Sequence, residues 1–515
     1  RSNIKDDRAR VLSYGWISRV PRPRGGPLVR GARDRHGVVL RQYLPMPPPR
    51  LPEIDYANHW RSALAEAESA IEKLRASERS THTFSPPKVF IYNLPAELSE
   101  GWDPESATVE EVFGPTLRSK RIWTNASLAK SKTDRTAPVA WWHRLSSERR
   151  SVMAEHVRDT NHYGFARAFV YRLWKSRRYR TFDPAKADLF LVPMLPLPKR
   201  GKFITSACER ISDSKVAAAL FPHFTEATAH KHFFLMAKEH YEGSQCPGWW
   251  ANPTGLFRKA QRLSYSTVQP DSIRADDYYE YERKTHGPPK CNDLWHHDGC
   301  PDYPNMADAP YLGNVHWPPD AATSSSSNVQ MIPPWADDGA LRPYLSVFLG
   351  GFSHGDTLVR RRMGTMCKGY ADTRTCLIQR YDFSTLLLKH LSTFCLEPGG
   401  DSPFRRSITD SVAFGCIPVF FSGAQDEAYS WLWGGWRRAA SVSVNRTLFL
   451  NGQIDLRKLL GSAPPKLVSL MRRTLAERAR AFTVSLEDDP MDAARSSGDQ
   501  VDMYLAYLLR RTKRR

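Results

Sequence analysis

Long hydrophobic runs are absent from this sequence. None of its 515 residues lies in an uninterrupted apolar run of 18 or more, so no part of the chain is predicted to span a membrane. Zinc-finger, RNP and helix-turn-helix signatures are absent as well, which argues against nucleic-acid binding although the formal charge is +20. Residues 1–50 carry +9 and the tail after Leu509 carries +5, which leaves +6 for residues 51–509. We therefore predict basic extensions on an ordinary globular protein, with no nucleic-acid partner.

Cysteine is scarce, with eight in the chain, so the fold is not a disulfide scaffold. Two pairs nevertheless have a suggestive spacing, because eight residues separate Cys291 from Cys300 and also Cys367 from Cys376. Each pair can close a short loop. Two adjacent histidines lie inside the first pair, but no CxxC or HxxxH spacing accompanies them. Disulfides, free thiols and a metal site all stay open for these cysteines.

Two N-glycosylation sequons favour a protein of the secretory lumen. They begin at Asn125 and Asn445 and read Asn-Ala-Ser and Asn-Arg-Thr. The chain starts at Arg1 rather than at Met, which permits an upstream signal or anchor. We expect membrane association only through such an anchor, absent from this chain.

Composition divides the chain into five predicted regions. Residues 1–51 are a basic, Pro/Arg-rich stem or linker, and residues 52–80 are an amphipathic helix with apolar residues at steps of four and three. That helix fits either a coiled-coil stem or docking on the body of the protein. The other regions are an N-terminal lobe (85–330) with a loop-rich insert (246–328), a C-terminal lobe (331–485), and a C-terminal helix with a basic tail (486–515).

Strand-like and helix-like segments alternate in both lobes. The first lobe has predicted strands at 88–94 and 187–194, with a helix at 163–176 between them. The second lobe has predicted strands at 345–351, 375–379, 392–398 and 416–421, with helices around 357–366, 383–391 and 402–414; helices at 465–484 and 501–509 follow. This alternation predicts parallel sheets in an α/β fold.

The stretch FCLEPGGDSPFRRSITDSVAFGCIPVFF (394–421) reads as strand, glycine turn, helix and strand. Ser402 and the following proline match an N-cap and a first helical residue. A helix that begins after such a turn directs free amides and its positive dipole end at the carboxyl edge of a parallel sheet, where anions bind. Arg405 and Arg406 suit bidentate phosphate contacts. Asp410 lies one helical turn beyond Arg406, where it can accept from ribose hydroxyls or pair with Arg406.

A second strand and glycine turn, LSVFLGG (345–351), precedes Arg360, Arg361 and Arg362. Three arginines in a row are commonly a solvated helix face. Two glycine turns in one lobe, each followed by arginines, together favour an anion site that includes Arg360.

The 394–421 stretch closely resembles the signature of exostosin-like glycosyltransferases. Its core GDSxxRRSxxDSxxxGCIPVFF looks most like the plant xyloglucan galactosyltransferase branch. Supporting matches are VFIYNLP (89–95), YRTFDPAKADLFLVP (179–193), HFF (232–234), MIPP (331–334) and the SVFLGG…VRRRM block, so that the resemblance covers roughly residues 88–485.

The resemblance implies two Rossmann-like lobes in the GT-B arrangement, with an acceptor-side N-terminal lobe and a nucleotide-sugar-binding C-terminal lobe. It also implies donor-binding roles for Arg360, Ser402, Arg405, Arg406 and Asp410. The diphosphate would be held by four of them, Arg360, Ser402, Arg405 and Arg406. The fifth, Asp410, would contact the ribose.

His232 is the residue to which the resemblance gives the role of general base. A neutral imidazole can take the proton of an acceptor hydroxyl. The sequence AHKHFF lacks the Gly-Arg-Asp that usually precedes this histidine in the family. A histidine beside two phenylalanines also fits a simple packing role, and both interpretations stay open.

The resemblance implies an inverting glycosyltransferase that uses a UDP-sugar, galactose being the first choice, and acts on a cell-wall or extracellular polysaccharide or a glycoprotein glycan. We expect no cofactor and no required metal, because arginines can neutralise the leaving diphosphate. The implied location is the Golgi membrane, as a single-pass type II protein with a lumenal catalytic domain. The alternative is a catalytically silent glycan-binding or scaffold partner, and homo- or hetero-oligomerisation stays open.

Overall fold

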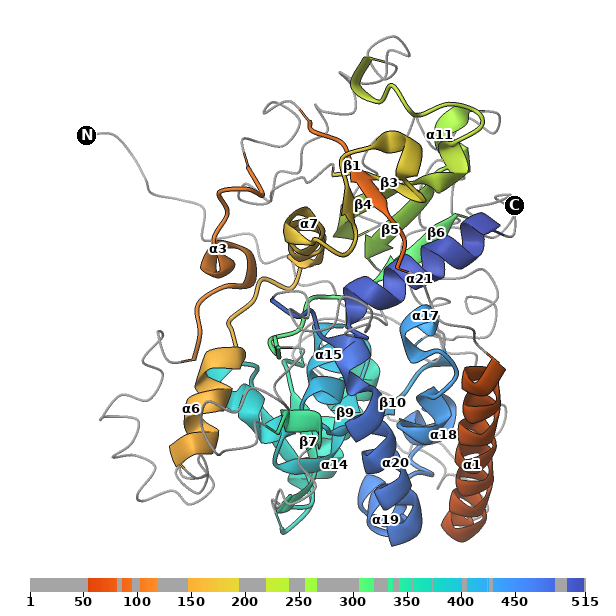
Figure 1. The fold of residues 1–515 in the computed structure, drawn as a ribbon. Helices are drawn as coiled ribbons and strands as arrows, with labels where there is room; N and C mark the ends of the chain where they lie inside the picture. Colours follow the sequence, from red (N-terminus) through yellow and green to blue (C-terminus); the bar gives the residue numbers. More distant parts are fainter. Residues whose placement is uncertain are drawn as a thin grey trace, which may run out of the picture. The chain divides into compact units, whose positions relative to one another are not determined.

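The computed structural model describes residues 54–80, 86–94, 102–117, 147–193, 219–239, 255–265, 305–318, 332–336, 342–352, 356–372, 374–400, 405–423, 425, 429–486 and 498–513. Residues 55–515 form one compact unit that contains two parallel β-sheets (Figure 1). Each sheet is surrounded by helices, so the α/β class and the two Rossmann-like lobes predicted from the sequence are confirmed.

The first sheet has the strand order β2-β1-β3-β4-β5-β6, with every neighbouring pair parallel. Its central strand β3 is buried along its whole length, as expected of a strand covered on both faces. The strands are β1 (Val89–Ile91), β2 (Arg180–Thr181), β3 (Leu189–Val192), β4 (His232–Glu239), β5 (Gln261–Tyr265) and β6 (Met306–Ala309).

The prediction of a loop-rich insert at 246–328 is wrong for β5 and β6, which both fall inside it. Their sequences, QRLSY and MADA, are short and partly polar, so neither has the continuous apolar run that identified the other buried strands. Pairing with β4 extends the first sheet through them.

The second sheet has the order β11-β10-β9-β7-β8, again wholly parallel. Counted within the lobe this is the doubly wound order 2-1-3-4-5, whose direction reverses between β7 and β9. The strands are β7 (Tyr344–Leu349), β8 (Leu377–Gln379), β9 (Ser392–Glu397), β10 (Ile417–Phe420) and β11 (Val442–Ser443).

The helices agree with most of the predicted ranges, although 383–391 forms a 3₁₀ helix, η4 (Phe383–Lys389). The α-helices are α1 (Tyr56–Ser80), α3 (Val109–Phe113), α6 (Ser147–His156), α7 (Phe165–Lys175), α11 (Leu256–Lys259), α14 (Thr357–Lys368), α15 (Arg406–Ala413), α17 (Ser430–Trp433), α18 (Arg446–Leu450), α19 (Leu456–Gly461), α20 (Pro465–Arg478) and α21 (Gln500–Lys513). The 3₁₀ helices besides η4 are η1 (Pro184–Lys186), η2 (Ala229–Lys231), η3 (Pro334–Ala336), η5 (Arg437–Ala439) and η6 (Ala479–Phe482).

The long helix α1 docks on the body of the protein, which decides between the two interpretations of residues 52–80. Its Trp60 is buried, and the indole Nε1 donates to the carbonyl of Leu459 at 2.9 Å. Glu66 and Glu68 add ion pairs to Arg438 (3.9 Å) and Lys466 (2.8 Å).

The C-terminal helix α21 returns to the first lobe after the second lobe is complete (Figure 1). Tyr504 is buried and packs edge-on against Phe169 of α7 and Phe233 of β4. Just before the helix, Asp499 lies 3.5 Å from Arg172 of α7, and both side chains are buried. The chain therefore passes from the first lobe to the second after β6 and returns to the first at α21.

Two disulfides lie in the described part of the second lobe. Cys367 and Cys376 form a disulfide, one of the three alternatives left open for this pair, whereas Cys291 and Cys300 lie outside the described residues. The second disulfide, Cys395–Cys416, joins β9 to the start of β10 and was not predicted. It closes a ring that contains the end of β9, the glycine turn and α15.

Removing the second disulfide is expected to lower the free energy of unfolding by about 3 kcal/mol, because an uncrosslinked loop of this length gains entropy in the unfolded chain. The variant is Cys395→Ala/Cys416→Ala, and the measurement is the guanidinium midpoint with and without reductant. As a control, Cys367→Ala/Cys376→Ala is introduced into both the wild-type protein and the Cys395→Ala/Cys416→Ala variant. In this background the two proteins should have nearly the same guanidinium midpoint under reducing conditions. An unchanged midpoint would contradict a native Cys395–Cys416 bond.

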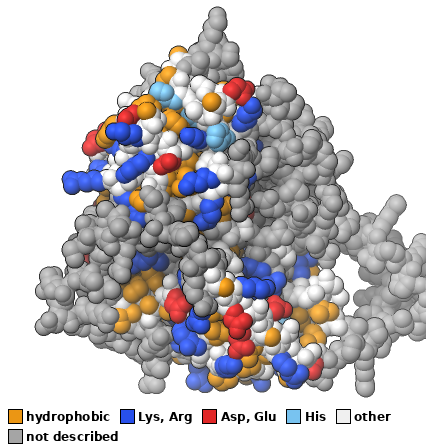
Figure 2. Space-filling view, turned by 45° about the vertical axis from the view of Figure 1, so that its right-hand side comes forward, with side chains coloured by type: hydrophobic (Ala, Val, Ile, Leu, Met, Phe, Trp, Pro, Cys, Tyr) orange, Lys and Arg blue, Asp and Glu red, His pale blue; other side chains and the backbone are white. Residues whose placement is uncertain are grey.

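Among the described residues no helix is long and apolar enough to cross a bilayer. On the face of the molecule drawn in Figure 2, Lys and Arg side chains lie among acidic and hydrophobic ones. The basic ends at residues 1–50 and 514–515 lie outside the described residues.

Candidate functional site

A cavity of about 290 Å³ opens at the carboxyl edge of the second sheet, where β7 and β9 end. These two strands flank the point at which the strand order reverses, the position where doubly wound folds bind their ligands. The second lobe contributes Gly350, Gly351, Arg360, Glu397, Arg405 and Arg406 to the wall, and the segment before α7 and the connection after β6 contribute His162, Tyr163 and Tyr311.

Arg360 ties the two glycine turns together. It projects from the first turn of α14, where Nε donates to the carbonyl of Gly399 and Nη1 to the carbonyl of Gly351, both at 2.9 Å. The guanidinium also lies over the ring of Phe348, 5.6 Å from its centre. Arg360 therefore lines the cavity from a fixed position, while its predicted role in an anion site stays a prediction.

The helix α14 is held at the same edge by Asp356, its N-cap. The Asp356 carboxylate accepts from the backbone amide of Val359 at 3.2 Å and pairs with Arg446 at 3.1 Å. A carboxylate at a helix N-terminus is favourable, because it interacts with the positive dipole end. Because Asp356 caps the helix and pairs with Arg446, α14 can start at this point although it contains three consecutive arginines.

Helix α15 begins later than predicted. Its first residue is Arg406 and its N-cap is Arg405, whose backbone is extended, so the predicted cap at Ser402 is wrong. Ser402 itself lies outside the described residues, and its diphosphate role stays a prediction. Arg405 and Arg406 both line the cavity, and their diphosphate-binding role stays a prediction.

Gly400 permits the close approach of Arg405. A Cβ atom at this position would collide with the Arg405 guanidinium, and the backbone of Gly400 does not have a positive φ. The sequence motif suggested that the glycines provide an unusual backbone turn. At Gly400 the structure gives a different reason, which is space for the arginine.

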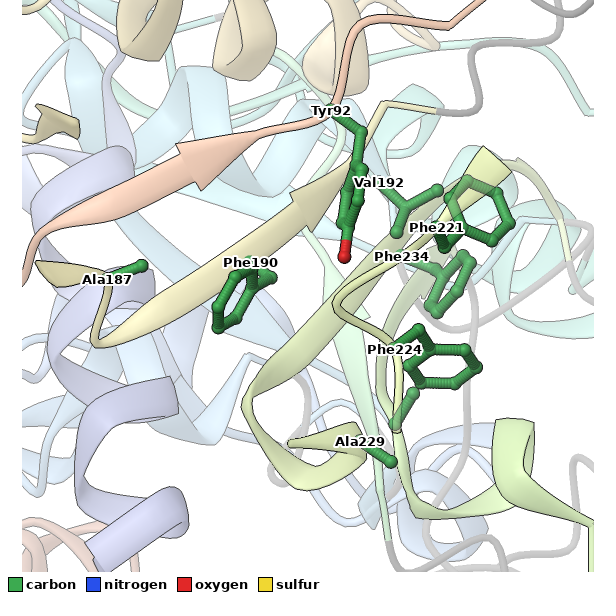
Figure 3. Packing of buried hydrophobic residues seen from close by; sticks show 9 residues of the cluster. Tyr92, Ala187, Phe190, Val192, Phe221, Phe224, Ala229 and Phe234 are labelled. Carbon is green, nitrogen blue, oxygen red and sulfur yellow. The ribbon is translucent and has the colours of Figure 1, made fainter. Parts of the chain in front are cut away.

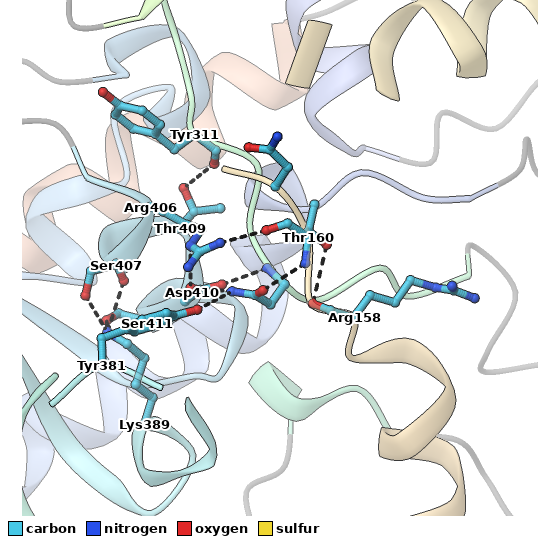
Figure 4. A network of polar contacts seen from close by, with 12 residues as sticks. Arg158, Thr160, Tyr311, Tyr381, Lys389, Arg406, Ser407, Thr409, Asp410 and Ser411 are labelled. Atoms are coloured by element: carbon cyan, nitrogen blue, oxygen red, sulfur yellow. Dashed lines mark hydrogen bonds and ion pairs between the residues drawn. The ribbon is translucent and has the colours of Figure 1, made fainter. Parts of the chain in front are cut away.

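Arg406 connects helix α15 to the first lobe. Its Nη1 donates to the carbonyl of Thr160 at 2.7 Å, and its guanidinium lies 4.8 Å from the ring centre of Tyr381 (Figure 4). Its Nε lies 3.8 Å from Asp410 Oδ2, one turn further along the helix. The predicted i,i+4 pair is therefore present, at the outer limit of an ion-pair distance.

Asp410 is completely buried and serves as an acceptor within the protein (Figure 4). Oδ1 accepts from the backbone amide of Asn314 at 2.8 Å, and Oδ2 accepts from the Asn314 side-chain amide at 2.9 Å. Burial raises the pKa of Asp410, and the charge of Arg406 opposes that rise. Of the two predicted roles, the structure contains the pairing with Arg406, and it shows no open side-chain surface for a ribose contact.

His232 lies in the aromatic core of the first lobe rather than at the cavity. Its ring stacks on Phe190 at 4.6 Å. Phe190 belongs to the cluster that Figure 3 shows together with Tyr92 and Phe224. Nδ1 donates to the carbonyl of Thr228 at 2.8 Å, which leaves Nε2 to accept from the Tyr92 hydroxyl at 2.8 Å. Burial lowers the pKa of His232 to about 4. The packing interpretation therefore fits the structure, and the predicted base role does not.

His162 is the cavity histidine that the sequence interpretation missed. It lies in a turn immediately before α7, beside Tyr163, with ring centres 4.0 Å apart. Burial lowers its pKa to about 4, and the charges of Arg406 and Arg405 act in the same direction. The imidazole is thus neutral near pH 7 and lines the same cavity as Arg405 and Arg406.

A metal site finds no support in the described residues, which contain no group of three or more His, Cys, Asp and Glu side chains able to hold an ion. The prediction that no metal is required stays a prediction.

The sequence of the lobe that carries the cavity is similar to a known protein family. The Exostosin GT47 domain matches residues 312–452, which include Arg360, Glu397, Arg405 and Arg406. Residues 312–452 are therefore similar to an exostosin domain. The predicted resemblance to exostosin-like proteins of the plant xyloglucan galactosyltransferase branch is confirmed.

Several proteins of Arabidopsis thaliana are similar to parts of this chain. The chain is similar to probable xyloglucan galactosyltransferase GT12 of Arabidopsis thaliana, with 33% identity over 143 residues, which cover 26% of this chain and 28% of that protein. It is also similar to xyloglucan galactosyltransferase MUR3 (38% over 85 residues; 16% and 14%) and to xyloglucan-specific galacturonosyltransferase 1 (38% over 88 residues; 17% and 12%), both of Arabidopsis thaliana. The matched segments thus span less than a third of the length of these relatives.

Among solved structures, an alpha,alpha-trehalose-phosphate synthase (UDP-forming) from Burkholderia vietnamiensis is similar over 67% of this chain and 83% of its own, with 13% identity and a TM-score of 0.27. This likeness is too weak to support a statement about the exostosin domain.

Proposed function

We propose that the chain is a glycosyltransferase that transfers a sugar from a UDP-sugar, galactose being the first choice, to a cell-wall or extracellular glycan with inversion. The observation that carries this proposal is the cavity at the strand reversal of the exostosin domain, with Arg360, Arg405 and Arg406 in its wall. Cationic, bidentate donors suit a diphosphate. The names of the relatives supply the acceptor class, since they act on xyloglucan.

In inverting transfer, the three arginines of the cavity wall and His162 would have different roles. An acceptor hydroxyl attacks the anomeric carbon as the bond to the diphosphate breaks. Arg360, Arg405 and Arg406 would stabilise the charge that develops on the diphosphate, since preorganised cations act strongly in a partly enclosed site. His162 would take the proton of the attacking hydroxyl as the general base. The arginines belong to the second lobe and His162 to the first, so the reaction would take place between the two lobes.

The first test is the binding of UDP. Millimolar UDP should raise the thermal midpoint of the wild-type protein, because a ligand that binds only the folded state stabilises it. Arg405→Ala should weaken UDP binding roughly tenfold, as expected for loss of a charge-assisted contact. Arg457→Ala, an exposed arginine of α19, is the matched control and should bind UDP normally.

Several outcomes would contradict the proposal. If neither UDP nor UDP-galactose shifts the midpoint, the cavity is not a UDP-sugar site, and a GDP titration then identifies or excludes a different nucleotide. If UDP binds but no UDP-sugar is ever hydrolysed or transferred, the chain is a binding partner without activity rather than an enzyme.

A further inference from the structure

Glu397 lines the cavity, and no predicted role explains it. It is the last residue of β9, and its neighbours on the chain begin the glycine turn bonded to Arg360. The side chain is buried although it lines the cavity. A buried carboxylate is costly unless charge and hydrogen bonds compensate it, so its position requires an explanation.

One oxygen of Glu397 is fully engaged inside the protein. Oε1 accepts from Lys389 Nζ at 2.8 Å, from Ser407 Oγ at 3.0 Å and from Ser411 Oγ at 2.5 Å. Lys389 Nζ also donates to the backbone carbonyl of Ser407 at 3.1 Å. These contacts fix the plane of the carboxylate and offset its charge.

The second oxygen, Oε2, has no donor among the residues that the structure describes. Glu397 lines the cavity, and Oε2 is not one of the described buried side-chain atoms left without a hydrogen bond, which makes Oε2 the carboxylate oxygen available to the cavity. The site therefore presents one fixed acceptor beside three arginines.

The carboxylate of Glu397 can bind only some of the groups that a nucleotide-sugar carries. A carboxylate accepts hydrogen bonds and repels phosphate oxygens, so it cannot share the diphosphate with the arginines. A nucleotide-sugar carries hydroxyl groups on both sides of its diphosphate, on the ribose and on the transferred sugar, and each can donate to a carboxylate. Asp410, the predicted ribose partner, has both oxygens bonded to Asn314 and cannot serve.

We propose that Glu397, through Oε2, binds a hydroxyl of the nucleotide-sugar, with the ribose hydroxyls as the first source and the transferred sugar as the second. The inference rests on the proposed function and names the residue of the same cavity that binds a hydroxyl group of the donor. Lys389, Ser407 and Ser411 then act as positioning residues, because they hold the carboxylate through its other oxygen.

The test is the affinity of wild-type protein and Glu397→Gln for UDP, 2′-deoxy-UDP, 3′-deoxy-UDP and UDP-galactose, measured by calorimetry. Lys389 needs an acceptor, so the amide introduced at position 397 should turn its oxygen toward Lys389 and present an NH₂ donor to the cavity. UDP affinity should fall about tenfold in the variant, the size expected for one charge-assisted hydrogen bond. The affinity for the deoxy analogue that lacks the recognised hydroxyl should be nearly the same in both proteins.

Two further variants separate recognition from structure. Glu397→Gln/Lys389→Met removes the buried pair as a neutral unit and should show the same hydroxyl dependence. Glu477→Gln, on the exposed surface of α20, is the control and should bind every ligand as the wild type does. A variant effect confined to UDP-galactose and absent with UDP would assign the contact to the transferred sugar.

An equal loss of affinity for UDP and for both deoxy analogues, with no extra loss for UDP-galactose, would overturn the inference while leaving the proposed function intact. Failure of the wild-type protein to bind UDP or UDP-galactose would contradict the proposed function, and the inference with it.

Discussion

His162→Ala is expected to lower the rate of UDP-sugar turnover about 100-fold, the lower end of the usual contribution of a general base, while UDP affinity stays within about twofold of wild type. The reason is the position of this histidine in the cavity wall, with a pKa lowered to about 4 by burial and by the neighbouring Arg406 and Arg405. Its neutral form, which accepts a proton, therefore dominates at every pH above that value. The measurement is UDP release from UDP-galactose under saturating donor.

The pH dependence of the wild-type protein follows from the same shift. The base form is present above the folded pKa and is lost as the pH falls through about 4, so kcat/KM should be flat from about pH 8 to 5 and fall below that. Bound diphosphate offsets the two arginine charges, so the inflection of kcat should lie at a higher pH than that of kcat/KM. His59→Ala, a histidine of α1 outside the cavity wall, is the matched control. Wild-type turnover in His162→Ala would rule out the base role.

Asp410→Ala is expected to lower the free energy of unfolding by about 3–5 kcal/mol, because it removes one partner from a buried charged network. The substitution leaves the backbone amide and side chain of Asn314 without their acceptor and leaves Arg406 without its carboxylate. Chemical denaturation followed by tryptophan fluorescence measures the loss. Asp372→Ala, at an exposed aspartate that pairs with nearby Arg374, should leave the midpoint unchanged.

A paired substitution distinguishes the structural role of Asp410 from the predicted ribose contact. Asp410→Asn should destabilise less than Asp410→Ala, since burial already disfavours the charged carboxylate. Asn314→Asp/Asp410→Asn exchanges the two partners and should recover part of the loss. If Asp410→Asn instead kept full stability and lost UDP affinity, the ribose assignment would be correct and the network described above would be incidental.

The local pattern of residues 394–421 predicted the strand, the glycine turn and the helix, together with the placement of Arg405 and Arg406 at the cavity. These features depend on contacts within one short stretch, so a short stretch can encode them. The Arg406–Asp410 pair follows in the same way from helical spacing. The late start of α15 at Arg406 could not be predicted, because Ser402 and its proline are a good cap in isolation.

The partners that decide function come from far along the chain. Asn314 is 96 residues from Asp410, and Thr160 is 246 residues from Arg406. His162 has no neighbouring motif, and only the fold brings it beside the second lobe. His232 was assigned by resemblance, but its two phenylalanine neighbours and the core of the first lobe determine its surroundings. Spacing alone could not distinguish these two histidines.

The return of α21 to the first lobe sets the order in which the protein can be completed during synthesis. Arg172 and Tyr179 find their carboxylate partners in Asp499 and Asp502, and Tyr504 fills the space beside Phe169. These partners leave the ribosome more than 300 residues after the groups they satisfy. The first lobe therefore emerges before the partners that complete it, and until α21 has been made it exposes an apolar surface and polar groups without these partners, the kind of surface that favours aggregation.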